Sequence, residues 1–225
     1  MPVVDDRPVA GAPNDIRFAC VILAAGRGAR FGEPKAGARL PPVSGGEMAS
    51  EPATLPATFL DEVVHLAAGS GATPIIAVVR PGWTVPPPAR AVVNARDESE
   101  QIASVRLGLA QLAGTPTQGV LLWPVDHPFV HIGSVLAIVD AYRRTKAPIV
   151  VPTHHGRRGH PVFFARETWP DLMAVEAGQG GSPQGGGARI IVRAYGDRVH
   201  EIAVVDGGIL RNIDTKADLA VGRGE

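Results

Sequence analysis

The chain has 225 residues with 22 basic and 22 acidic side chains, so its formal net charge is zero. A neutral chain has no overall field that attracts nucleic acid or an anionic membrane, and we expect neither as a partner. The length suits one α/β domain and is short for two. The single cysteine, Cys20, excludes an internal disulfide and is typical of a reducing compartment, so we expect a cytoplasmic protein.

Residues 1–17 contain acids and prolines where a secretory signal would have a basic start and an apolar stretch. We therefore expect a flexible leader there, followed by a single folded domain over residues 18–222. No apolar run approaches the roughly 20 residues that span a bilayer, so we expect no membrane insertion.

The first predicted element is a strand over residues 19–25 (ACVILAA), because a continuous apolar run ending in glycine is typical of a strand buried on both faces. The segment 37–56 is rich in proline, glycine and small residues, and we predict an irregular excursion. A helix is expected from about Ala57, because apolar residues recur there at helical spacing, namely Leu60, Val63, Val64 and Ala67.

Apolar strands and amphipathic helices continue to alternate along the chain. Two further helices are predicted from apolar residues at helical spacing, which are Ile102, Val105, Leu109 and Leu112 in one and Ile132, Val135, Val139 and Tyr142 in the other. Strands are predicted over residues 74–80, 90–95, 119–126, 148–153, 160–165 and 201–206. The alternation favours a doubly wound, mostly parallel, Rossmann-like sheet, in which ligands bind beyond the carboxyl ends of the strands. The low-complexity segment 178–187 is expected to be a flexible glycine-rich surface loop.

The loop that follows the first strand, in VILAAGRGARFGEPKA, matches neither of two common phosphate-binding patterns. The dinucleotide pattern G-x-G-x-x-G fails because Phe31 stands at its third glycine, and the P-loop pattern fails because Ala36 follows Lys35. Between Gly26 and Lys35 the cations Arg27, Arg30 and Lys35 are opposed only by Glu33. Glycine backbone N–H groups and cationic side chains together suit a polyphosphate, although a solvated basic turn is the alternative.

The stretch LAAGRGARFGEPK resembles the signature L-A-A-G-x-(S/G)-x-R-x-G-x-x-K of nucleotidyltransferases, most closely the branch of molybdenum cofactor cytidylyltransferases, the MobA-like NTP transferases. Four further stretches occur in the same order as in that branch, namely VVNARDESEQIASVRLGL, LLWPVDHPFV, GRRGHPVFF and NIDTKADL. The resemblance extends from about Ala19 to Leu219. It implies the nucleotide-diphospho-sugar transferase type of fold and a reaction that transfers NMP from NTP to a phosphorylated acceptor and releases pyrophosphate.

Within that branch the resemblance favours CTP as the nucleotide and molybdopterin as the acceptor, with an apo molybdenum enzyme as a possible recipient of the product. The reason is Ala24 and Ala25 before Gly26, since the related guanylyl enzymes tend toward L-A-G-G. Sugar-phosphate nucleotidyltransferases share the Ala-Ala-Gly form, so they and guanylyltransferases stay open as alternatives. A nucleotide-sugar glycosyltransferase is disfavoured because PVDHP has one acid where a D-x-D motif has two. A non-catalytic NTP-binding module is the remaining alternative.

The resemblance also implies roles for individual residues. Arg30, Lys35 and Asp126 would be catalytic. The nucleotide would be bound by Leu23, Ala24, Ala25, Gly26, Arg27, Gly28, Asn94 and Ser104. The family often has a serine run where this chain has Ile102 and Ala103, so Ser104 is the hydroxyl candidate, with an ordinary helix position as the alternative.

Nucleotidyl transfer brings two anions together, and Mg²⁺, which takes one or two carboxylates plus phosphate oxygens, is the expected cofactor. Asp126 directly follows a predicted strand and is the first expected metal ligand, with capping of the helix near Ile132 as the alternative. Asp214 is the second, although Asp214 or Thr215 could instead cap the closing helix, with Asp218 as partner.

The stretch GRRGHP resembles a family segment that faces the acceptor, and from it we expect Arg158 and His160 to bind an anionic acceptor. The histidines of the chain also raise the alternative of a zinc site, which is disfavoured because Pro128 interrupts His127 and His131 and no cysteine is nearby.

Overall fold

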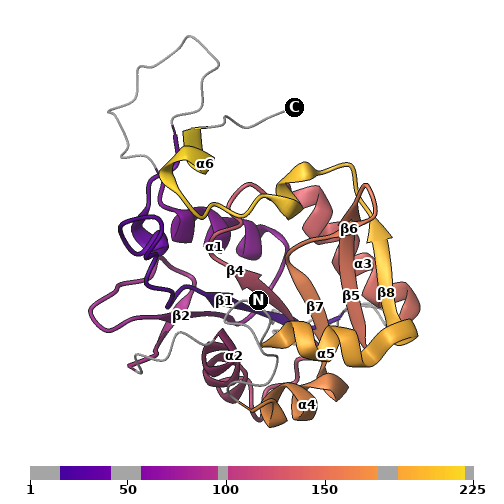
Figure 1. Ribbon diagram of the computed structural model, residues 1–225. Helices are drawn as coiled ribbons and strands as arrows, with labels where there is room; N and C mark the ends of the chain where they lie inside the picture. The colour runs from indigo at the N-terminus through magenta and orange to yellow at the C-terminus, as the bar shows by residue number, and fades with distance from the viewer. Residues whose placement is uncertain (1–15, 42–56, 96–100, 177–186, 221–225) are drawn as a thin grey trace, which may run out of the picture.

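The structure is a computed structural model that describes residues 16–41, 57–95, 101–176 and 187–220 (Figure 1). The expected leader, the excursion and the glycine-rich loop therefore lie largely outside the described residues. Of the leader, Ile16 packs against the core and the carbonyl of Arg17 accepts a 2.7 Å hydrogen bond from the backbone N–H of Gln118.

One mixed sheet of eight strands forms the centre of the molecule, in the order β3-β2-β1-β4-β7-β5-β6 with β8 also paired to β5. The strands are β1 (Phe18–Leu23), β2 (Ile75–Val79), β3 (Arg90–Val93), β4 (Gly119–Pro124), β5 (Ile149–His154), β6 (Arg157–Arg158), β7 (Val162–Ala165) and β8 (Val199–Ala203). The mostly parallel α/β fold predicted from the sequence is confirmed, and β7 is antiparallel to both neighbours. The seven residues between β5 and β7 are too few for a parallel crossover, so the chain can only turn back.

Helices cover both faces of the sheet (Figure 1). They are α1 (Phe59–Gly69), α2 (Gln101–Ala110), α3 (Ile132–Thr145), α4 (Trp169–Ala174), α5 (Ala188–Tyr195) and α6 (Lys216–Ala220), with short 3-10 turns η1 (Lys35–Gly37), η2 (Arg166–Thr168), η3 (Gly196–Arg198) and η4 (Gly207–Leu210). No described helix has the length and apolar character needed to cross a membrane.

Alternate residues of β1 build two separate cores, one on each face of the sheet. Cys20 and Ile22 pack with α1 and α3, whereas Ala19 and Val21 pack with α2, α4 and α5. A strand with both faces covered must be apolar throughout, which explains the continuous run in the sequence. The Cys20 thiol is fully buried, and burial raises its pKa, as suits a residue that fills the core.

The parallel pairing of β1 with β4 places the functional segments side by side. Leu23 at the end of β1 is in register with Pro124 at the end of β4. The loop after β1 and the turn that holds Asp126 therefore leave the same edge of the sheet, where ligands bind in folds of this kind.

Candidate functional site

The loop after β1 is folded back on itself and anchored in the core. Gly28 has φ +62°, and a Cβ there would overlap the carbonyl oxygen of Glu33, so glycine is required. Phe31 is buried and its ring lies 6.0 Å from that of Phe59 in α1, in an edge-to-face arrangement. The position that breaks the dinucleotide pattern thus fixes the loop before Lys35.

Lys35 joins two carboxylates that are remote from it in sequence. Its Nζ donates to Asp126 Oδ2 at 3.0 Å and to Asp214 Oδ1 at 2.6 Å. The other carboxylate oxygen of Asp214 lies 3.2 Å from Nη1 of Arg30. The Lys35 side chain is only 13% exposed, whereas that of Arg30 is 63% exposed. The structure therefore brings together all four residues that the sequence analysis assigned to catalysis or metal binding.

Asp126 is held in its ionised form by its neighbours. Its Oδ1 lies 3.0 Å from Nδ1 of His127, and the backbone carbonyl of His127 accepts a hydrogen bond from the Trp123 indole N–H at 3.1 Å. Burial opposes ionisation, but the hydrogen bond and charge of His127, together with Lys35, outweigh it and hold the pKa of Asp126 well below its usual range. Asp126 is thus available as an anionic ligand at neutral pH.

The helix cap that the sequence allowed at Asp214 or Thr215 is formed by Thr215, and the Asp214 side chain is not needed for it. Thr215 forms a capping box with Asp218, because its hydroxyl accepts from the Asp218 N–H at 3.2 Å and its own N–H donates to Asp218 Oδ2 at 2.7 Å. The Asp214 carboxylate is left to face Lys35 and Arg30. A backbone hydrogen bond of 2.9 Å from Ile213 to the carbonyl of Asp126 ties the two carboxylate segments together.

Asp126 does not cap α3. The carboxylate of Asp206 does so, accepting from the N–H of His131 and from the hydroxyl of Ser134, both at 2.8 Å. The capping alternative for Asp126 is therefore excluded, and its carboxylate faces Lys35 and His127 instead.

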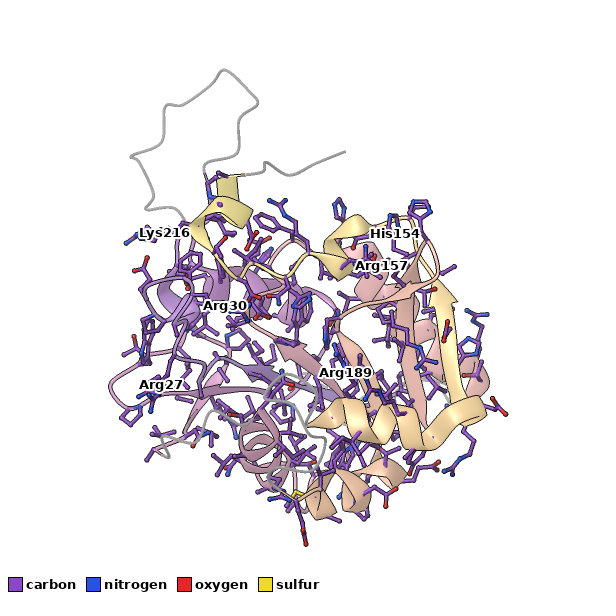
Figure 2. All side chains as sticks on the ribbon, in the orientation of Figure 1. Arg27, Arg30, His154, Arg157, Arg189 and Lys216 are labelled. Carbon is purple, nitrogen blue, oxygen red and sulfur yellow. The ribbon has the colours of Figure 1, made fainter. Side chains whose placement is uncertain are left out.

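A cavity of about 810 Å³ opens beside this group, and its wall includes Leu23, Gly26, Arg30 and Asp126. Other predicted nucleotide-binding residues lie outside the wall. Ala24 and Ala25 pack in the cores on the two faces of the sheet, and Gly28 forms the turn described above. Arg27 is exposed and lies away from Arg30 (Figure 2).

Asn94 and Ser104 are buried and bonded to each other, with the Asn94 amide donating to the Ser104 hydroxyl at 3.1 Å. This bond ties the end of β3 to α2 and uses one acceptor position of the Ser104 hydroxyl, the group expected to meet the nucleotide. Both residues lie outside the cavity wall, whereas Gln101 and Ile102 line it.

The two residues expected at the acceptor differ in their surroundings. Arg158 lines the cavity, but its guanidinium is paired with Glu201 at 2.7 Å. The ring of His160 lines the cavity and packs edge-to-face on that of His127 at 4.7 Å between centroids. Its Nδ1 is buried without a hydrogen-bond partner in the described structure. Burial, followed by the charges of His127 and Arg189, lowers the pKa of His160 to about 3, so the ring is neutral at pH 7.

The donor set suits a hard cation. Asp126 and Asp214 supply carboxylate oxygens beside the loop after β1, and carboxylate oxygens are ligands that Mg²⁺ takes in nucleotide enzymes. Among the described residues, no three histidine, cysteine, aspartate or glutamate side chains gather into a metal-binding group.

Helix α5 forms a cavity wall that the sequence analysis missed. Ala188, Arg189, Val192 and Arg193 line the cavity from this helix. The signal was present in ARIIVRAY, where Ile191, Val192 and Tyr195 are buried and the arginines, four residues apart, share the other face. It was overlooked because the segment directly follows the low-complexity loop.

The comparisons with known proteins show the family of the chain and its fold. The profile of the MobA-like NTP transferase domain matches residues 20–199, which is most of the chain. No curated protein matches the sequence.

Among solved structures, Rv0371c from Mycobacterium tuberculosis H37Rv is similar with a TM-score of 0.70 at 24% identity, covering 91% of this chain and 96% of that one. The structure of Rv0371c in complex with manganese has a TM-score of 0.61 at 22% identity, covering 91% of this chain and 96% of that one. The 2-C-methyl-D-erythritol 4-phosphate cytidylyltransferase from Thermus thermophilus gives 0.61 at 20% identity, with 92% and 98% covered. At these identities the structural likeness shows the fold, whereas the profile match shows the family: the chain belongs to the MobA-like NTP transferase domain family and is a nucleotidyltransferase.

Proposed function

We propose that this protein transfers NMP from an NTP to the phosphate of a small acceptor, with Mg²⁺ as cofactor and pyrophosphate as the second product. The observation that carries the proposal is the contact of one ammonium group, Lys35 Nζ, with Asp126, which lines the cavity, and with Asp214. These groups supply cationic donors and anionic metal ligands at one point, as a reaction between two phosphates requires.

Asp126 and Asp214 would hold the metal ion. Bound Mg²⁺ would neutralise charge on the triphosphate oxygens as the reaction proceeds. A manganese complex of the structurally similar Rv0371c supports a divalent cation in this fold.

The residues of the chain itself would bind and orient the reactants. Arg30 and Lys35 would donate charge-assisted hydrogen bonds to the triphosphate, with Lys35 already fixed by two carboxylates. An oxygen of the acceptor phosphate would bond to the α-phosphorus while the bond from that phosphorus to the bridging β-phosphate oxygen breaks and pyrophosphate leaves. Binding in a fixed geometry would supply much of the rate enhancement.

CTP is the proposed nucleotide, and molybdopterin is the first proposed acceptor, on the sequence resemblance given above. A polyol phosphate is the second candidate, because the similar structure from Thermus thermophilus is a cytidylyltransferase for such an acceptor. A cytoplasmic location and an apo molybdenum enzyme as recipient of the product stay predictions.

The test is pyrophosphate release from CTP, GTP, UTP and ATP with Mg²⁺, each with molybdopterin or with 2-C-methyl-D-erythritol 4-phosphate. We expect release with CTP and one acceptor and none without an acceptor. Turnover with GTP alone would assign a guanylyltransferase. Transfer of a sugar from a nucleotide sugar without pyrophosphate release would overturn the proposal.

A further inference from the structure

The cavity carries a second group of cations away from the Lys35 cluster. Among the described residues that line it, five are arginines and two, Asp126 and Glu176, are acids. The arginines are Arg30, Arg157, Arg158, Arg189 and Arg193. Figure 2 labels Arg30, Arg157 and Arg189, which come from three different elements, the loop after β1, β6 and α5.

These arginines divide into paired and unpaired side chains. Arg30 is paired with Asp214 and Arg158 with Glu201. Arg157, Arg189 and Arg193 make no ion pair with any residue that the structure describes. Three guanidinium groups around one cavity repel one another unless an anion lies between them, and guanidinium forks bind phosphate oxygens in pairs.

The three arginines reach the cavity from two elements. Arg189 and Arg193 lie four residues apart on α5, on either side of Val192, which also lines the cavity. Arg157 lies on β6, three residues before the half-buried His160, and both line the cavity. The unpartnered Nδ1 of His160 adds a neutral polar group to the same wall.

The space between the two cationic groups is apolar at its floor. Val151, Val162 and Phe164 are buried strand residues that line the cavity on the sheet face beneath α5. A volume of about 810 Å³ lies toward the upper end of the usual range for a small-molecule site, so it has room for two ligands.

We propose that Arg157, Arg189 and Arg193 form the acceptor subsite and bind a phosphomonoester dianion separately from the triphosphate. This inference rests on the proposed function and assigns the acceptor end of the same cavity. In-line transfer places the attacking and leaving oxygens on opposite sides of the α-phosphorus, and the two cationic groups lie on different walls, as that arrangement requires.

The test is calorimetric titration with two inorganic probes. Tripolyphosphate with Mg²⁺ is first titrated into the protein, and inorganic phosphate is then titrated into the saturated protein. We expect the Arg189→Gln/Arg193→Gln variant to bind phosphate about tenfold more weakly than the wild type and tripolyphosphate within about twofold. Arg144→Gln on α3, which removes a remote surface cation, should change neither affinity.

Each outcome decides the inference. Equal phosphate affinity in wild type and the double variant would overturn it, as would absence of phosphate binding to the saturated wild type. Equal weakening of both probes would show that the arginines serve the triphosphate, which also overturns it. If the double variant has a lower melting temperature, Arg157→Gln gives the same comparison. Failure of tripolyphosphate to bind the wild type would count against the proposed function alone, since phosphate titrated without it still tests the arginines.

Discussion

The two cationic groups of the cavity differ in how their charges are satisfied. Lys35 and Arg30 contact carboxylates of the protein itself, whereas Arg157, Arg189 and Arg193 have no acidic partner among the described residues. The paired group is ordered before any ligand arrives, and its carboxylates stay available as metal ligands. The unpaired group would take its counter-charge from a ligand. Under the proposed function, the paired group is a fixed reaction centre and the unpaired group is a separate anion-binding wall of the same cavity.

The largest expected effect comes from removing an anion of the paired group. Asp126→Asn keeps the shape but removes the charge that faces Lys35 and His127, so we expect pyrophosphate release to fall by about 10³-fold. Asp140→Asn on α3, an aspartate paired with surface arginines, is the matched control and should keep full activity. Full activity in Asp126→Asn would remove this carboxylate from the mechanism.

Variants of His127 test whether the fixed position of the Asp126 carboxylate contributes to metal binding. His127 is a positioning residue whose Nδ1 contacts Asp126, and outer hydrogen bonds of this kind typically change metal affinity by about 10 to 100-fold. We expect His127→Ala to weaken Mn²⁺ binding, measured by electron paramagnetic resonance, by about tenfold or more. His127→Asn restores a donor near Nδ1 and should recover most of the affinity. Equal loss in both variants would indicate a packing role against His160 instead.

The unpaired group is tested by kinetics once the acceptor is identified. The Arg189→Gln/Arg193→Gln variant should raise the KM of the acceptor by about tenfold, because charge-assisted hydrogen bonds to one substrate are lost. The KM of the nucleotide should stay within about twofold. An equal rise in the KM of the acceptor and the KM of the nucleotide would show that the two groups of cations form one site.

His160, which lines the cavity and packs on His127, gives the smallest effect. Its pKa is about 3 in the folded chain and about 6.5 in an unfolded one, so the unfolded state binds the proton first as the pH falls. The free energy of unfolding should therefore decrease between pH 6.5 and 3, by at most about 1.4 kcal/mol per pH unit from this residue. His160→Gln should flatten that dependence in urea unfolding measured at pH 7 and pH 5. If the free energy of unfolding of His160→Gln has the same pH dependence as that of the wild type, burial does not keep the His160 ring neutral.

The sequence predicted the fold well where the spacing of apolar residues follows their burial in strands and helices. The apolar runs of β1, β2 and β4 and the first amphipathic helix appear close to the predicted bounds. The antiparallel β7 was not predicted, because apolar runs do not encode strand direction and only the length of the connection does.

The site was predictable in its residue types and only partly in its geometry. Lys35 meets Asp126 across 91 positions and Asp214 across 179, and such pairing depends on the sheet topology rather than on local pattern. The capping box of Thr215 and Asp218 is local and could be anticipated, as could its coexistence with an Asp214 carboxylate that faces the cations. The bond between Asn94 and Ser104 required the tertiary structure, as did the position of α5 at the cavity, although the amphipathic pattern of that helix was present in the sequence.

The most direct test of the central claim is the affinity for CTP measured by calorimetry with and without Mg²⁺, in the wild type and in Asp126→Asn. A site in which Asp126 and Asp214 hold a metal against the triphosphate predicts that Mg²⁺ strengthens binding by about tenfold or more in the wild type and has little effect in the variant. Metal-independent binding of equal strength in both proteins would contradict the account.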